Sequence, residues 1–480
     1  MNRSLAAAGQ LEFAIASAAA VLIGLSAATG TAPGLVAPAA AFAVLVVVAR
    51  LYEIEWRTTI VVLLLVVLFI PIRRYSLAVN LPFQLEPYRA LVMVLAALWA
   101  AFLLLDRRLK IRASGLEAPL ALLGVAVLGS IVTNFESITN EDLSGAVVKK
   151  LTFWVGFMLV LYMVVSLSSR ADVDVYLRVL VLGTAALGAL GVFEWSTGTN
   201  VFANLDRLVP ILAPVGDQLD TFRAGLNRAY GSAQHPIAYG AALALILPIA
   251  VVYAFRRRTV LWFVCAGLIV MGALASISRT SLIMLMVSAG VMAILKPRAA
   301  RQAIPFVLPL LVAIQLALPG TFSTTKALFF PSGGLVEEQA TAEVGSGRVA
   351  SFGPAIDEAS RHPFFGRGFG TRLVGNDPNR NSFILDDEWL STTLEIGLVG
   401  VVAWAWIFVR FCSRAIRGSK AGDDEVHWML AALAASVASF AVGMGFYDAF
   451  SFIQVTLLMI VLLGIGSVLL RNVPNRGAPA

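Results

Sequence analysis

Long apolar runs alternate with short polar segments along almost the whole chain. The runs approach the roughly twenty residues that a helix needs to cross the hydrocarbon core of a membrane. Hydropathy predicts about fourteen spans, at residues 11–29, 34–49, 58–72, 87–105, 116–133, 149–168, 174–195, 236–255, 259–277, 280–295, 302–319, 389–409, 427–446 and 449–470. The pattern therefore predicts an all-α polytopic membrane protein with about 12–14 transmembrane helices. The run at 11–29 is expected to be an uncleaved first span, because so many spans follow it.

Composition supports this class and excludes others. Of 480 residues, 59% are hydrophobic and 14% are charged, against about a quarter charged in a soluble domain. The two cysteines lie in or beside apolar runs, so no disulfide framework is predicted. The net charge of +7 does not indicate nucleic-acid binding, because the basic residues form short clusters between the spans.

The basic clusters predict the orientation in the membrane. They lie at 107–112, 256–258, 296–301, 410–420 and 471–476. All five fall on one side if the N-terminus is cytoplasmic, as the positive-inside rule requires, and both termini are then cytoplasmic. The loops 196–235 and 321–388 then face the extracytoplasmic side, the second one before the last three helices, and a shorter third loop at 134–150 joins them. We divide the chain into N-terminal transmembrane helices at 1–195 and a second membrane region at 196–480.

The segment from Lys326 to Glu388 is the densest in groups that bind or transfer charge. It ends in three adjacent carboxylates, Asp386, Asp387 and Glu388. Because adjacent carboxylates repel one another, at least one is expected to have a raised pKa, which suits a general base. The alternative is an acidic cap on the following helix. Glu395 lies among apolar neighbours in that helix and is expected to pair with an outward arginine.

Two arginines stand on the predicted outer side beside apolar spans. Arg279, in the turn SISRTS, either reaches to lipid headgroups or binds an anion together with its serine and threonine neighbours. Arg228 opens RAYGSAQHP. With Arg223 it either solvates a loop or contacts a ligand that the small residues allow to approach closely. His235, before a proline, fixes how the next helix begins.

The large loop contains two further glycine-rich motifs. Arg348 follows Gly-Ser-Gly, and His362 and Arg367 belong to HPFFGRGFG. A nucleotide-binding loop is not predicted, because no strand precedes these glycines. The alternative is a tight turn that packs the aromatic pair into the membrane interface. A short helix is predicted at 355–361, ended by His362-Pro363. The three histidines are far apart and no cluster has ligand spacing, so neither metal nor cofactor is expected.

Taken in order, four motifs resemble the O-antigen ligase and polymerase family of bacterial envelope glycosyltransferases. They are R-x-x-G followed by HP at 228–236, the SR turn at 278–279, SGR with HPFFGRGFG in the large loop, and W-L-x-x-x-L-E-x-G-L-x-G at 389–400. The resemblance covers residues 190–465. It implies a metal-independent, GT-C-like enzyme that makes surface polysaccharide or exopolysaccharide.

The resemblance also implies substrates and residue roles. A glycan on undecaprenyl pyrophosphate would move to an acceptor sugar hydroxyl, on a glycolipid or another lipid-linked repeat, at the outer face of the bacterial inner membrane. Arg228 and Arg279 would neutralise the leaving pyrophosphate. Asp386 stands where many members have histidine, and would be the base unless His362 has taken that role. The remaining candidate substrate-binding residues are Arg223, His235, Arg348, Arg367, Asp387 and Glu388.

The rival class is a lipid-linked oligosaccharide flippase or other transporter. Transporters usually place binding groups near the midplane, on broken helices in two related halves. Here the polar groups cluster at the predicted outer side and the halves look unrelated. A non-catalytic chain-length regulator would not need Arg279 and Asp386 together. The sequence therefore favours the glycosyltransferase.

Overall fold

The computed structural model describes residues 55–78, 85–106, 108–215, 222–223, 226–330, 348–372 and 385–471. The predicted spans at 11–29 and 34–49 lie outside these residues. The other twelve predicted spans are helices: α3 (Trp56–Phe69), α4 (Pro87–Leu105), α5 (Glu117–Thr133), α7 (Ser144–Leu167), α8 (Arg170–Thr197), α9 (Pro236–Arg257), α10 (Val260–Ala275), α11 (Arg279–Leu295), α12 (Pro297–Ala317), α16 (Glu388–Lys420), α17 (Glu425–Gly443) and α18 (Ile453–Arg471).

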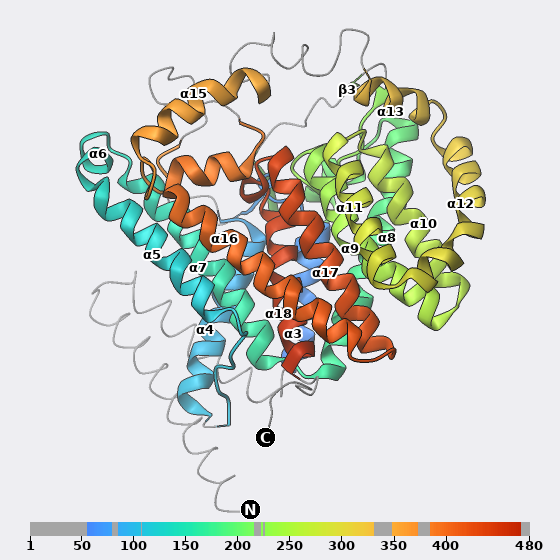
Figure 1. The fold of residues 1–480 in the computed structure, drawn as a ribbon, viewed down its shortest axis with the longest axis horizontal. Helices are drawn as coiled ribbons and strands as arrows, with labels where there is room; N and C mark the ends of the chain where they lie inside the picture. The colour runs from blue at the N-terminus through green and yellow to red at the C-terminus, as the bar shows by residue number, and fades with distance from the viewer. Residues whose placement is uncertain are drawn as a thin grey trace, which may run out of the picture.

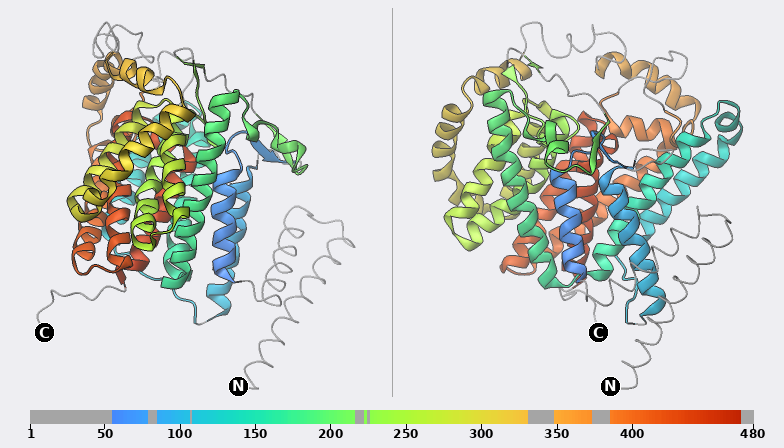
Figure 2. Two further views of the ribbon diagram at one scale, coloured as in Figure 1. Left: turned by 90° about the vertical axis from the view of Figure 1, so that its right-hand side faces the viewer. Right: turned by 180° about the vertical axis from the view of Figure 1, so that it is seen from behind.

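These helices form a multi-pass membrane protein. Within the described residues, eight are long and apolar enough to cross a membrane, and α3, α5, α10 and α11 are shorter apolar helices. This confirms the predicted all-α polytopic fold. The helices run side by side, and the longer connections gather at the end where α13 and α15 lie (Figures 1 and 2).

Short elements occur in the connections. The helical ones are α6 (Phe135–Asn140), η1 (Val201–Arg207), α13 (Thr321–Phe329), α15 (Arg348–Arg361), η3 (Met444–Phe446) and η4 (Ala449–Ser451). Strand β1 (Tyr75–Leu77) pairs antiparallel with β2 (Leu212–Pro214), and β3 (Phe222–Arg223) pairs with β4 (Leu226–Asn227). Helix α15 ends at Arg361, before His362-Pro363 as predicted, but it begins seven residues earlier than the predicted start at Ala355.

The core lies around α9, α17 and α18. Nearly every residue of α18 is buried, and the apolar residues of α9 are buried on all sides, which is the pattern of a helix enclosed by others. Helix α18 packs on α7, α16 on α5, and α10 on α8. Helices from both predicted regions therefore share one core, and the division near residue 195 stays a prediction.

The basic clusters lie together at one end of the bundle. Arg410 Nε donates to the Gly115 carbonyl at 2.6 Å, and Lys296 Nζ donates to the Ser419 carbonyl at 3.0 Å. Near the same end, Arg257 pairs with Glu425 at 2.7 Å. Two further contacts join the remaining clusters, from Arg112 N to Ser166 Oγ and from Arg471 Nη1 to the Val165 carbonyl. The described members of all five clusters thus share one side, as predicted.

The third predicted loop is shorter than expected. It was predicted to run from Asn134 to Lys150, but α7 already begins at Ser144, so Lys150 lies inside this helix. The predicted span began at Lys149, five residues after the observed start of α7 at Ser144. Lys150 is tolerated because an acidic partner on another helix neutralises it.

Candidate active site

Helix α16 is kinked at Gly397, where φ is +67°. A methyl group at this position would lie 2.1 Å from the carbonyl oxygen of Phe364. Only glycine satisfies both the left-handed backbone and this close approach. Beyond the kink, Leu398 N donates to the Pro363 carbonyl at 2.8 Å, so the loop replaces a hydrogen bond that the kink removes from the helix.

The HPFFGRGFG loop docks on this kink through its backbone. Arg367 N donates to the Leu394 carbonyl at 2.8 Å, and Asn134 Nδ2 donates to the Gly366 carbonyl at 3.0 Å. Gly366 has φ of +67° and touches the α16 backbone. The glycines therefore serve close packing of the loop against α16 and α5. Phe364 is exposed, as expected for a residue at the membrane interface.

An ion pair joins α7 and α16 beside the kink. Lys150 Nζ contacts Glu395 Oε2, and the Glu395 side chain is only 9% exposed. Ser130 Oγ donates to the Glu395 carbonyl at 2.6 Å. The prediction that Glu395 pairs with an arginine was wrong, because its partner is a lysine from the first half of the chain. The pair offsets the cost of placing either charge in a membrane.

An apolar cavity of about 500 Å³ extends from this ion pair between α5, α7 and α16. Along α7 its wall contains Lys150, Trp154, Met158 and Tyr162, which are four residues apart and so share one face. These residues span about 18 Å along the helix axis. The polar lining groups Lys150, Glu388 and Glu395 belong to the outer ends of α7 and α16. The cavity is therefore a long apolar groove with a charged head.

The three adjacent carboxylates have separate environments. Asp387 caps α16 by accepting a hydrogen bond from Leu390 N at 3.0 Å, as the alternative reading predicted. Glu388 is buried and accepts a hydrogen bond from Phe450 N at 2.8 Å. Asp386 adopts a left-handed φ of +50°. Strain of this kind in a non-glycine residue is commonly found at functional sites.

The structure adds Asp448, which the sequence analysis did not single out. It lies in the connection 444–452 between α17 and α18, where burial raises its pKa to about 6. The guanidinium of Arg372 opposes this shift and the charge of Asp386 adds to it, and the value of about 6 includes both effects. Asp448 Oδ1 is buried and accepts no hydrogen bond from the described residues. The sequence did contain a signal for Asp448, because this residue stands between two apolar spans, as Arg279 does.

The two predicted anion ligands come from neighbouring segments. Arg228 is buried, and its Nε donates to the Ser276 carbonyl at 3.1 Å. Arg279 is the first residue of α11, where Ser278 caps the helix. The turn between them is strained, because Ile277 has φ of +46°. The structure therefore brings Arg228 to the turn that carries Arg279.

This turn also touches the segment that carries Asp448. Thr280 Oγ1 donates to the Phe446 carbonyl at 3.1 Å. On the other side of the same segment, Glu388 holds Phe450 N and Trp389 Nε1 donates to the Ala441 carbonyl at 2.9 Å. The connection 444–452 thus joins the arginine turn to the carboxylates of α16.

A buried carboxylate on α8 holds the loop that carries Arg228. Glu194 accepts hydrogen bonds from Gly231 N at 2.9 Å, Tyr230 N at 3.3 Å and Asn200 Nδ2 at 2.9 Å. These three donors account for its burial. Glu194 is a positioning residue that the sequence analysis missed.

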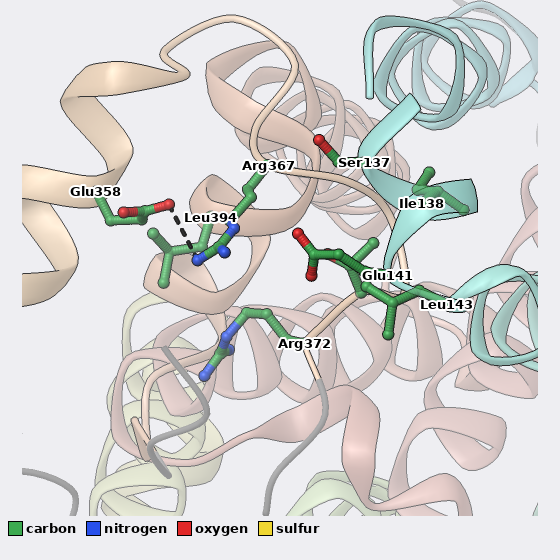
Figure 3. Close-up of a pocket in the computed structure, with 9 residues that line it drawn as sticks. Ser137, Ile138, Glu141, Leu143, Glu358, Arg367, Arg372 and Leu394 are labelled. Carbon is green, nitrogen blue, oxygen red and sulfur yellow. Dashed lines mark ion pairs between the residues drawn. The ribbon is translucent and has the colours of Figure 1, made fainter. Parts of the chain in front are cut away.

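The remaining predicted residues are spread over the outer connections. Arg367 Nη1 pairs with Glu358 Oε1 of α15 at 3.3 Å, and Arg372 lies nearby on the same loop (Figure 3). His362 is exposed, directly after the end of α15. Arg348 begins α15 and Arg223 lies in β3, and only their backbones are described.

His235 has the structural role that was predicted for it. It caps α9, and its Nδ1 accepts a hydrogen bond from Ile237 N at 3.2 Å. The following Pro236 occupies the first helical position, where a missing N–H does no harm. The imidazole also stacks on Phe452, with ring centroids 6.0 Å apart. No group of three or more metal-ligating side chains occurs among the described residues.

The described residues thus form a multi-pass membrane protein with charged side chains gathered at one end of its helices. Residues 264–405 match the family described as O-antigen ligase. The match confirms the resemblance and shows that the chain carries an O-antigen ligase domain, which belongs to an enzyme family. Arg279 and Asp386 lie inside the matched region, whereas Lys150, Arg228 and Asp448 lie outside it. A search of curated proteins finds no match to the chain.

Proposed function

We propose that the protein is a glycosyltransferase of the bacterial inner membrane. It moves a glycan from undecaprenyl pyrophosphate to an acceptor sugar hydroxyl at the extracytoplasmic face, as a ligase or a polysaccharide polymerase. The O-antigen ligase domain at 264–405 supports the class of reaction. The common side of the basic clusters supports cytoplasmic termini and an extracytoplasmic site.

The apolar groove with a charged head carries this proposal. Its volume of about 500 Å³ and its apolar walls suit a polyprenyl chain. Its head, with Lys150 and Glu388, adjoins the connection that bears Asp448. A lipid whose tail fills the groove therefore presents its pyrophosphate to the charged groups of the outer end.

The arginines stabilise the leaving group in this scheme. When the bond between the anomeric carbon and pyrophosphate breaks, negative charge grows on the pyrophosphate oxygens. Arg228 and Arg279 neutralise it, with Arg348 as a third contact. A fixed guanidinium is effective here because it forms strong charge-assisted hydrogen bonds and needs no reorganisation during the reaction. The buried Arg228, held by the Ser276 carbonyl, meets this requirement.

A carboxylate takes up the proton of the acceptor sugar hydroxyl. The hydroxyl oxygen attacks the anomeric carbon, a new glycosidic bond forms, undecaprenyl pyrophosphate leaves, and the hydroxyl proton passes to Asp386. The charge of Asp386 acts on Asp448, whose pKa is raised to about 6. A carboxyl group with a pKa near the working pH of an enzyme is suited to assist general base catalysis. We assign Asp386 as the base and Asp448 as the group that tunes it.

A flippase is the competing function, and the two make opposite predictions in a host lacking the gene. We would reintroduce Arg279→Ala and Asp386→Ala, with Arg57→Ala, an exposed arginine of α3, as the control. The proposal predicts that both site variants insert normally, leave lipid-linked glycan on the outer leaflet and yield no product, whereas the control restores product. Accumulation on the cytoplasmic leaflet would instead establish a flippase.

A further inference from the structure

The apolar groove with the charged head is called the lipid groove below. A second cavity, of about 280 Å³, has a separate set of lining residues. Its lining includes Arg73, Arg74, Asn200, Gln234, His235 and Phe452. No acidic side chain is among the described residues that line it. Phe452 belongs to the connection 444–452, and Phe450 of the same connection lines the lipid groove. The two cavities therefore flank the segment that carries Asp448.

The walls of this cavity are held firmly. Gln454 Nε2 donates to the Val67 carbonyl at 2.8 Å, which fixes the end of α3 just before Arg73. Arg74 Nη2 donates to the Ala203 carbonyl at 2.8 Å. On the opposite wall, Asn200 uses its amide on Glu194 Oε1 at 2.9 Å. The cavity is thus a built feature of the fold.

The polar side chains of the lining include several hydrogen-bond donors. Gln234 Oε1 accepts from Ile453 N at 3.2 Å, so the amide nitrogen of Gln234 remains as its donor. Arg73 is exposed and has a left-handed φ of +64°. Such a backbone in a non-glycine residue is strained and marks a candidate functional position.

The positive charge of two arginines and the amide of Gln234, with no carboxylate among the described lining residues, favour an anionic, hydrogen-bonding ligand. We infer that this cavity binds the acceptor, and that the acceptor is a saccharide carrying a carboxylate or phosphate group. The inference rests on the proposed function, in which the lipid groove holds the donor and the acceptor approaches from another side. The connection 444–452 then lies between the two substrates, with Phe450 facing the donor and Phe452 facing the acceptor.

Binding to the purified full chain in lipid nanodiscs, without donor, tests the inference. The probes are a short oligogalacturonate with its carboxyl-reduced form, and glucose 6-phosphate with glucose. We expect one anionic probe to bind at least about tenfold more tightly than its neutral partner, as loss of a charge-assisted hydrogen bond implies. The probe pair whose anionic and neutral members bind differently identifies the anionic group as a carboxylate or a phosphate. Equal binding of both pairs would overturn the inference without any variant.

Variants of two arginines that flank the same helix localise the binding. Arg73→Gln is expected to remove the preference for the anionic probe, and Arg73→Lys to keep part of it. Arg57→Gln, at the other end of α3 and paired with Glu55, is the matched control. An anionic preference that survives in Arg73→Gln would place the ligand elsewhere. Release of undecaprenyl pyrophosphate from a donor tests the proposed function separately. A failure of the acceptor inference can therefore be distinguished from a failure of the proposed function.

Discussion

Lys150 of α7 and Glu395 of α16 form an ion pair at the head of the lipid groove, although 245 residues separate them in the chain. The kink at Gly397 and the docked HPFFGRGFG loop fix the α16 side of this pair. The contact therefore joins the first half of the chain to the part that matches the O-antigen ligase family. It also marks the depth at which the apolar groove becomes charged.

Breaking this pair separates its structural role from its functional role. Lys150→Met or Glu395→Gln alone is expected to destabilise the fold by about 3 kcal/mol, because one charge stays buried without its partner. The double variant Lys150→Met with Glu395→Leu is expected to recover thermal stability but not transfer activity, since the groove loses its charged head. Thermal unfolding in detergent and product formation measure the two effects. Full activity of the double variant would show that the pair is structural only.

Gly397→Ala tests the kinked helix. The left-handed backbone and the Phe364 carbonyl both exclude a methyl group, so we expect a loss of about 1–3 kcal/mol in stability. The control is Gly290→Ala in α11, where an added methyl group meets no atom within 4 Å. Thermal unfolding compares them. Equal stabilities would contradict the role assigned to the loop contact.

The lipid groove predicts a change in substrate length preference. Gly124 of α5 lines the groove, and a methyl group there meets no atom within 4 Å. Gly124→Phe is expected to narrow the groove and raise KM for an undecaprenyl donor, with a smaller effect on a short-chain prenyl donor. Gly290→Phe, outside the groove, serves as the control. An equal rise in KM for both donor lengths would argue against a tail in this groove.

The carboxylate pair predicts the pH profile. The transfer rate is expected to rise with pH through about 6, because Asp448 has a raised pKa of about 6 and the pair must lose its proton to act as a base. Arg372 lowers the pKa of Asp448. Arg372→Gln is therefore expected to move this acid limb upward by about one pH unit.

Arg367→Gln provides the control for this shift, because Arg367 pairs with Glu358 on α15. Its acid limb is expected to stay in place even if its overall rate falls. A profile that moves equally in both variants, or in neither, would remove Asp448 from the assigned pair.

The sequence was sufficient to predict which described segments are helices. It did not predict where α7 begins. Apolar runs of the right length predict spans because the membrane demands them, and all twelve predicted segments among the described residues are helices. Helix α7 begins at Ser144, five residues before the predicted span, and the partner of its Lys150 is Glu395 on a distant helix. Local hydropathy contains no information on such a pairing.

The candidate site was only partly predictable, for the same physical reason. Arg279 was recognisable as an isolated charge in a short turn, and His235-Pro236 as a helix start. Asp448 stands in an equally short turn, but its raised pKa depends on burial and on charges from Arg372 and Asp386. A tight turn was one interpretation of the glycines in HPFFGRGFG, and the approach of Gly366 to the backbone of Glu395 supports this packing role. Their function was set by a kink that the motif itself does not reveal.

Product formation by the purified protein tests the central claim most directly. The chain in lipid nanodiscs would receive undecaprenyl-pyrophosphate-linked glycan and a saccharide acceptor, with products followed by mass spectrometry. We predict release of undecaprenyl pyrophosphate in step with a longer or newly attached glycan, and loss of both in Asp386→Asn. An intact donor, or a donor moved between leaflets without cleavage, would contradict the glycosyltransferase account.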